Sequence, residues 1–343
     1  MKKLFLLIVS VLAMSMYAEK IEDYRKVADI DYVGDNHTGH KMDVYYPLGG
    51  GEDQIFPVAI HIYGSAWMMN NMKSSADLNT AGLGILKANY VLVVPNHRSY
   101  NDAKYPAQIQ DIKAVVRYLR ANAEELRIDT SFIAISGFSS GGQLAGMMGV
   151  TGGETLYKYG GTVSMDLEGN LGKYTNESSR VDAVCIWSGM VDQRNKGCAG
   201  NPMSMSPEDD LVGGCNAQQC PDKHAMIACN TFITEDDAPT LIIHGSADNI
   251  VPLCEAKMYY DDLQRGGVES KMITHTQGHT VVDDLTGDMM EFFNLIQEKK
   301  KASVGVENVR VKSDVKKVVE NGVIYILRDG KRYNVLGSLV PEL

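Results

Sequence analysis

The sequence predicts an α/β protein in which a mostly parallel central sheet is covered by helices on both faces. Strands buried on both faces are almost continuously apolar, and such runs occur at 56–63, 90–94, 132–136, 181–187 and 240–244. Segments with helical spacing alternate with them, at 75–87, 106–123, 140–150 and 252–265. The chain has 343 residues, 44% of them hydrophobic, which is enough for one large core. We therefore expect one main domain.

The N-terminal segment predicts a secretory signal peptide at 1–18. Lys2 and Lys3 precede an apolar run at 4–14, and small residues up to Ala18 follow it. The run is too short to span a membrane stably, so we expect cleavage after Ala18. The mature chain is then expected in the periplasm, at the cell surface or outside the cell.

The chain ends predict antiparallel elements outside the parallel sheet. Runs at 27–33 and 42–46 predict an entry hairpin. After a strand at 269–274 and a closing helix at 281–299, residues 299–303 resemble a linker in composition. Two alternating runs, 323–328 and 331–336, then flank an Asp-Gly turn and predict a small hairpin. We expect a catalytic domain at 19–300 and a linker with a β-rich tail at 301–343.

The charge balance argues against one class of partner. The formal net charge is −10, and loss of Lys2 and Lys3 with the signal peptide would make it −12. An acidic chain of this kind does not favour nucleic acid or another anionic polymer as its main partner. A neutral substrate is expected instead.

Six cysteines in an exported chain predict disulfides. Four of them lie in a polar segment at about 193–236, which we interpret as a loop insertion closed by up to two bridges of undetermined pairing: Cys198, Cys215, Cys220 and Cys229. Cys185 lies in an apolar run and is expected to be a buried thiol, while Cys254 fits either state. Zinc binding is disfavoured, because the sequence has no C-x-x-C pair or H-E-x-x-H motif.

The segment 137–141 carries the strongest chemical signal. Its sequence, Gly-Phe-Ser-Ser-Gly, fits the G-x-S-x-G pattern between an apolar strand and a helix. Only Ser139 has glycine both two residues before and two residues after it. This pattern predicts a nucleophilic serine on a sharp, strained turn.

A serine nucleophile needs a base and a third group that orients the base, expected here in the order acid, then histidine. Asp248 follows the buried strand 240–244 at its carboxyl end, where ligand sites of such sheets lie. His279 follows the last strand and a glycine. Asp192 is the alternative acid, and His275 is the alternative base.

The developing charge on a substrate carbonyl oxygen requires backbone N–H donors. One is expected from Ser140, the residue after the nucleophile. Others are expected from the loop after strand 56–63, where Gly64, Ser65 and Ala66 are small enough for close backbone approach.

The aromatic and Met-rich residues near these motifs are candidates for lining a substrate pocket: Tyr63, Trp67, Met68, Met69, Trp187 and Met190.

With these motifs, residues from about 27 to 295 resemble the α/β-hydrolase superfamily, and more narrowly the bacterial feruloyl and acetyl esterases related to hormone-sensitive lipase. The motifs that carry the resemblance are Tyr-Gly-Ser-Ala-Trp at 63–67, Asn-His-Arg at 96–98, Pro-Ala-Gln-Ile-Gln-Asp at 106–111, Gly-Phe-Ser-Ser-Gly-Gly at 137–142, His-Gly-Ser-Ala-Asp at 244–248 and Gly-His at 278–279. One motif departs from the family pattern, because the usual His-Gly-Gly-Gly-Trp appears at 63–67 as Tyr-Gly-Ser-Ala-Trp.

The resemblance implies Ser139 as nucleophile, Asp248 as acid and His279 as base. It also implies an oxyanion hole made by the N–H groups of Ser65, Ala66 and Ser140. We expect a secreted serine carboxylesterase that removes acetyl or hydroxycinnamoyl groups from plant polysaccharide or oligosaccharide, without a cofactor or metal. The tail at 321–337 resembles terminal segments of secreted polysaccharide-degrading proteins, some of which are sorting signals for secretion machinery.

Two alternatives remain open at this point. One is a peptidase of the prolyl-oligopeptidase type, which the lack of a propeller-like repeat region disfavours. The other is a catalytically silent α/β-hydrolase used for binding, which the presence of all three triad candidates disfavours.

Overall fold

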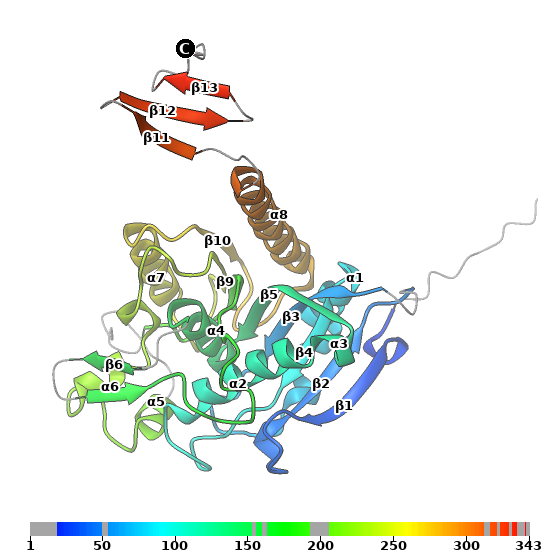
Figure 1. The fold of residues 1–343 in the computed structure, drawn as a ribbon. Coiled ribbons are helices and arrows are strands. Elements are labelled where there is room, and N and C mark those ends of the chain that lie inside the picture. Colours follow the sequence, from blue (N-terminus) through cyan, green and yellow to red (C-terminus); the bar gives the residue numbers. More distant parts are fainter. Residues whose placement is uncertain are drawn as a thin grey trace, which may run out of the picture.

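A computed structural model describes residues 19–49, 54–152, 156–159, 163–192, 206–311, 316–320, 323–328, 331–334 and 340. The predicted signal peptide lies outside these residues. Helices α2 (Ala107–Ala121), α4 (Ser140–Val150), α7 (Leu253–Arg265) and α8 (Thr286–Val311) surround a central sheet (Figure 1). Within the described ranges, no helix combines the length and the apolar character needed to span a bilayer.

The central sheet has eight strands in the order β1-β2-β4-β3-β5-β8-β9-β10. Their bounds are Arg25–Asp31 (β1), Lys41–Tyr46 (β2), Phe56–Ile62 (β3), Val91–Pro95 (β4), Ile128–Phe138 (β5), Ala183–Trp187 (β8), Thr240–Gly245 (β9) and Ser270–His275 (β10). Strand β2 pairs antiparallel with both β1 and β4, and every other pairing in this sheet is parallel. The predicted entry hairpin and mostly parallel sheet are confirmed.

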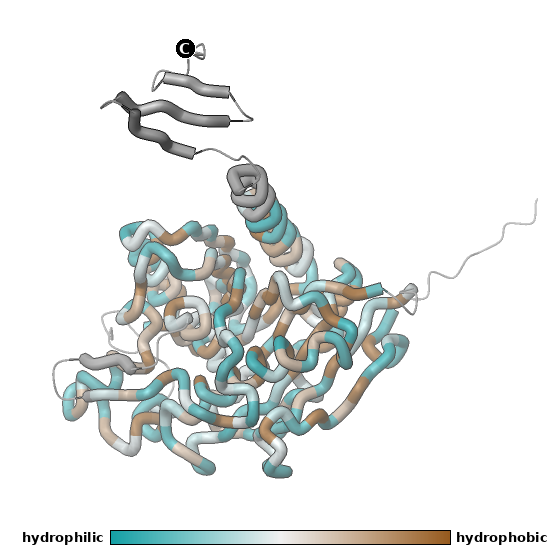
Figure 2. The backbone as a smooth tube through the Cα atoms, in the orientation of Figure 1, coloured by the Kyte–Doolittle hydropathy of each residue, from teal (hydrophilic) through white to brown (hydrophobic). Residues whose placement is uncertain are grey.

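Alternate side chains of each central strand enter one of two apolar cores. On β3, Val58 and Ile60 pack in the core that includes α2, α4 and α7, while Ala59 packs in the core that includes α1 (Leu83–Lys87) and α8. All three side chains are fully buried, which explains the continuous apolar run in the sequence. Figure 2 shows hydrophobic residues on the strands of the sheet and also on the helices around it.

An ion pair between Arg98 and the buried Asp111 connects the segment after β4 to α2. The Arg98 guanidinium donates to both carboxylate oxygens of Asp111, at 2.6 and 2.9 Å to Oδ1 and at 3.1 Å to Oδ2. The backbone N–H of Arg98 also donates to Oδ2, at 2.7 Å. Both motifs that contain these residues carried part of the family resemblance. In this structure the pair of Arg98 and Asp111 holds α2, which contains Asp111, against the segment that follows β4.

Several connections differ from the sequence prediction. The segment predicted as a helix at 75–87 is a short 3-10 turn, a π-helical stretch at Leu78–Gly82 and then α1. The excursion at 151–180 contains a two-stranded antiparallel sheet, β6 (Leu156–Tyr159) with β7 (Val163–Asp166). Periodicity is hard to detect in four-residue strands, which is why the sequence showed none.

Helix α8 is longer than predicted, because it continues through the residues predicted as a linker, 299–303, to Val311. Beyond it, β11 (Lys316–Glu320), β12 (Val323–Arg328) and β13 (Lys331–Asn334) pair antiparallel in a separate three-stranded sheet (Figure 1). Helix α3 (Ala123–Leu126) follows α2 after a one-residue break at Asn122.

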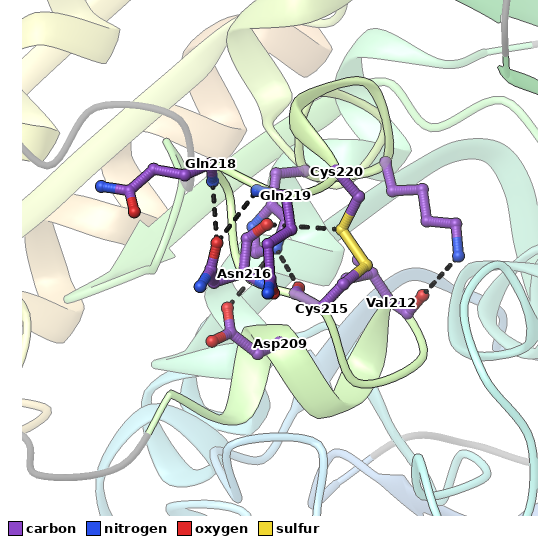
Figure 3. Close-up of a disulfide and its surroundings, with 9 residues drawn as sticks. Asp209, Val212, Cys215, Asn216, Gln218, Gln219 and Cys220 are labelled. Carbon is purple, nitrogen blue, oxygen red and sulfur yellow. Dashed lines mark hydrogen bonds and ion pairs between the residues drawn. A yellow bond between two sulfur atoms is a disulfide. The ribbon is translucent and has the colours of Figure 1, made fainter.

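The insertion after β8 carries helices α5 (Pro207–Leu211) and α6 (Pro221–Ala225), joined by a loop that the Cys215–Cys220 disulfide closes (Figure 3). Inside this loop Asn216 Oδ1 accepts the N–H groups of Gln218 and Gln219, each at 3.0 Å. The bridge and these turn bonds make the loop compact.

The other cysteines correct part of the disulfide prediction. Cys229, which we grouped with the bridging cysteines, is a free and buried thiol. Cys254 is disulfide-bonded. The prediction of a buried thiol at Cys185 is confirmed, and Cys198 lies outside the described residues.

Candidate active site

Ser139 lies on the turn between β5 and α4, with φ 56° and ψ −120°. L-amino acids rarely adopt this conformation, and it costs on the order of 1–3 kcal/mol. The Ser139 N–H donates to the Trp187 carbonyl at 2.9 Å, and the Ser139 carbonyl accepts the Gln143 N–H at 3.1 Å. These bonds hold the strained turn in place, as the sequence predicted for a nucleophile elbow.

Glycines around the turn allow backbone segments to approach each other closely. A Cβ at Gly137 would lie 2.2 Å from the Gly141 carbonyl oxygen, and one at Gly141 would lie 2.3 Å from the Ile62 carbonyl oxygen. A Cβ at Gly64 would lie 2.8 Å from the Ser139 Cβ. The small residues flanking the serine are therefore required by packing, and the loop after β3 lies directly against the serine.

Asp248 and His279 meet beside this turn. The two side chains are joined by a 2.8 Å hydrogen bond between His279 Nδ1 and Asp248 Oδ2. The His279 ring also lies against the Phe138 ring, with 4.6 Å between centroids, which places it next to the residue that precedes Ser139. The structure thus brings the three residues proposed from the sequence to one edge of the sheet.

The Asp248 carboxylate is held as an anion. Burial alone would raise its pKa, but the hydrogen bonds from His279 and from the N–H groups of Val251 and Ile250 outweigh burial and lower the pKa to about 2. Asp248 Oδ1 accepts both backbone N–H groups at 2.9 Å. One oxygen therefore fixes the loop, and the other oxygen orients His279.

The loops that carry the acid and the histidine are bound side by side. The Ser246 N–H donates to the His275 carbonyl at 2.7 Å, and the Ala247 N–H donates to the Gln277 carbonyl at 3.2 Å. Any Cβ at Gly245 would lie 2.3 Å from the Gln277 carbonyl oxygen. Glycine at this position permits the contact that brings the two loops together.

The alternative acid and base have other partners. Asp192 Oδ2 accepts a hydrogen bond from Asn230 at 2.8 Å. His275 Nδ1 accepts the Gln277 N–H at 3.3 Å, and burial lowers the pKa of the His275 imidazole. The observed geometry favours Asp248 and His279 over both.

The predicted oxyanion donors lie together, but one of them is engaged. The Ser65 N–H donates to the hydroxyl of Ser140 at 2.9 Å, whereas the Ala66 N–H has no partner among the described residues. Ser140 is the first residue of α4, so its N–H has no carbonyl partner within the helix. The N–H groups of Ala66 and Ser140 are therefore available to a substrate oxygen.

The prediction that Tyr63, Trp67 and Trp187 line a substrate pocket is wrong for this structure. Their exposed fractions are 1%, 0% and 0%, so they offer no surface to a ligand. Tyr63 stacks on His97 with 4.9 Å between ring centroids, and Trp67 Nε1 donates to Gln143 Oε1 at 3.3 Å. Large aromatic rings at strand ends fill the core below the loops instead. Met68 and Met69, on the same loop, are 37% and 44% exposed.

His244 is a site residue that we did not assign from the sequence. Its buried Nε2 lies 2.9 Å from the Val251 carbonyl oxygen and 3.4 Å from Asp248 Oδ2. Burial lowers the pKa of this imidazole, which favours its neutral form behind the carboxylate. The available signal was its place in the His-Gly-Ser-Ala-Asp motif at 244–248, four residues before Asp248. The described side chains include no group of three or more His, Cys, Asp or Glu placed to bind a metal.

Comparison with known proteins places this site in a family. The BD-FAE family model matches residues 42–263, which include Ser139 and Asp248. This chain belongs to the BD-FAE family. The family consists of bifunctional feruloyl and acetyl esterases with the α/β-hydrolase fold.

Solved structures similar to this BD-FAE chain include a truncated carbohydrate esterase from gut microbiota, with 37% identity and a TM-score of 0.76, covering 81% of this chain and 98% of that one. A bifunctional GH43-CE protein from Bacteroides eggerthii has 39% identity and a TM-score of 0.74, covering 79% of this chain and 35% of that one. Among curated proteins, the probable carboxylic ester hydrolase LipM of Mycobacterium tuberculosis is 25% identical over 71% of this chain and 53% of its own length. The chain spans about half the length of the curated relatives it matches.

Proposed function

We propose that this chain is a serine carboxylic ester hydrolase that removes acetyl or hydroxycinnamoyl groups from plant polysaccharide or oligosaccharide. The observation that carries the proposal is the 2.8 Å Asp248–His279 hydrogen bond beside a serine held at positive φ. Membership of the BD-FAE family supports the same chemistry.

In the proposed mechanism, Ser139 Oγ attacks the ester carbonyl carbon while His279 Nε2 accepts the hydroxyl proton. Asp248 accepts a hydrogen bond from His279 Nδ1, which fixes the required tautomer and stabilises the imidazolium that forms. The N–H groups of Ala66 and Ser140 stabilise the oxyanion. The protonated His279 then donates its proton to the leaving sugar oxygen, which leaves an acyl-enzyme on Ser139.

Deacylation repeats these steps with water. His279 removes a proton from a water molecule, the resulting hydroxide attacks the acyl carbonyl, and Ser139 Oγ leaves with the proton returned by His279. The products are a carboxylic acid and free enzyme. No cofactor takes part in this sequence of steps.

We further propose that the chain is exported after loss of residues 1–18, with the catalytic domain at 19–300. The β-rich tail at 301–343 is proposed as a segment that secretion machinery recognises. The basic start at Lys2 and Lys3, the apolar run at 4–14 and the small residues up to Ala18 support the export proposal.

The test is acid release from acetylated xylan and from a feruloylated arabinoxylan fragment, measured in parallel, with Ser139→Ala as the control. Release of one acid by the wild type and its loss in the variant is the expected result and identifies the acyl group. Absence of release from both substrates by folded wild-type protein would contradict the proposed substrate class. Equal release by the Ser139→Ala variant would contradict the mechanism.

A further inference from the structure

The hydroxyl of Ser140 joins the two segments that form the oxyanion site. Ser140 is fully buried at the start of α4, directly after Ser139. Its Oγ accepts the Ser65 N–H at 2.9 Å, across 75 residues of sequence. This bond connects the nucleophile turn to the loop that follows β3.

The loop after β3 needs such an anchor, because its backbone is strained. Ala66 and Trp67 have φ angles of 50° and 55° in succession, a left-handed conformation that costs roughly 1–2 kcal/mol for each non-glycine residue. The loop is also held at its far end, where the Tyr100 N–H donates to the Trp67 carbonyl at 2.9 Å and the Met68 N–H donates to the Ser65 carbonyl at 3.0 Å. At its near end, Ser140 Oγ accepts the first N–H after Gly64.

We propose that the Ser140 side chain is a positioning residue that locks this loop, and that the oxyanion hole therefore uses two backbone donors, the N–H groups of Ala66 and Ser140. The Ser65 N–H is a structural donor and does not contact the substrate. This inference rests on the proposed esterase function and assigns a role within the same site. It explains how alanine is tolerated at position 66 despite its positive φ, since the Ser140–Ser65 bond fixes the residue directly before it.

The proposal predicts a specific kinetic pattern for Ser140→Ala. The variant keeps the Ser140 backbone N–H but loses the anchor, so the Ala66 donor moves away from its position. Complete loss of one oxyanion donor costs about 10²–10³ in kcat, so a displaced donor is expected to lower kcat about tenfold. KM is expected to stay within about twofold, because the donors act mainly on the transition state. Ser140→Thr, which retains the hydroxyl, should recover most of the activity.

Ser188→Ala is a matched control. Ser188 is also fully buried near the site, and its Oγ has no hydrogen-bond partner in the described part of the chain. Removing this hydroxyl breaks no bond, so kcat should stay within about twofold of the wild type. Thermal unfolding of all variants checks that each one is folded.

The experiment combines p-nitrophenyl acetate kinetics with amide hydrogen exchange at Ser65. A selective fall in kcat together with faster exchange of the Ser65 N–H in Ser140→Ala would support the lock. Unchanged or increased kcat in that variant would overturn it, and so would unchanged Ser65 exchange. The exchange readout needs no substrate, so a wild type that fails to hydrolyse carbohydrate esters refutes the proposed function without affecting this comparison.

Discussion

Replacing Asp248 by asparagine tests the orientation of the proposed base. The structure assigns different partners to the two carboxylate oxygens, with Oδ1 on the N–H groups of Ile250 and Val251 and Oδ2 on His279 Nδ1. An asparagine can keep its carbonyl oxygen on the two backbone donors. Its NH₂ group then faces His279 Nδ1 and donates to it.

This change reverses the hydrogen bond and therefore the tautomer. Nδ1 of His279 becomes the acceptor, the ring proton moves to Nε2, and Nε2 can no longer remove the Ser139 proton. A tautomer error of this kind lowers kcat about 10⁴-fold, which corresponds to about 5 kcal/mol of transition-state stabilisation. The isosteric amide should leave the loop bonds in place, so we expect the variant to remain folded at neutral pH.

The assay is steady-state hydrolysis of p-nitrophenyl acetate, with thermal unfolding as the folding check and Asp192→Asn as the control. Asp192 is also an acid on a loop after a sheet strand and is only 3% exposed, but its carboxylate accepts a hydrogen bond from Asn230 rather than from His279. Its asparagine variant should therefore lose less than about tenfold in kcat. An Asp248→Asn variant within tenfold of the wild type, or an Asp192→Asn variant that loses as much activity, would refute the assignment of the acid.

Three further predictions concern packing, the disulfide and pH. Gly64→Ala would place a Cβ 2.8 Å from the Ser139 Cβ, so it should lower the free energy of unfolding by about 1–3 kcal/mol and kcat about 10²-fold. The control is Gly287→Ala, whose Cβ would meet no atom within 4 Å and which should be neutral or stabilising. Denaturant unfolding compares the two variants. Replacing Cys215 and Cys220 by serine opens a short loop and should cost about 2 kcal/mol of unfolding free energy in the same assay; an unchanged unfolding midpoint would contradict it. The folded-state pKa of Asp248 is about 2, below its ordinary 3.8, so the unfolded state binds the proton first as the pH falls. The stability present above pH 5 should therefore fall by about 1 kcal/mol between about pH 4 and pH 2. In urea titrations, Asp248→Asn should lack this part of the acid dependence.

Local sequence patterns were sufficient to predict the sheet and the approximate position of the site. A strand buried on both faces, such as β3 or β9, requires apolar residues at every position, so it is visible without tertiary information. The turn at Ser139 was equally visible, because positive φ and close backbone contacts select for small neighbours such as Gly137 and Gly141. Strand order in the chain then placed Asp248 and His279 at one sheet edge.

Only the tertiary structure decided which polar atoms meet. The 2.9 Å bond between Ser65 and Ser140 and the position of His244 behind Asp248 depend on contacts between loops that are distant in sequence. The burial of Tyr63, Trp67 and Trp187 depends on how loops cover the strand ends, and an aromatic residue at a strand end fits a core or a pocket equally well. Periodicity along the chain reports the solvent exposure of a local face, whereas partners in space are set by the packing of several elements at once. The fold class and the strained turn at Ser139 were therefore determined locally, whereas the hydrogen bonds around that turn and the burial of the aromatic rings were determined by tertiary packing.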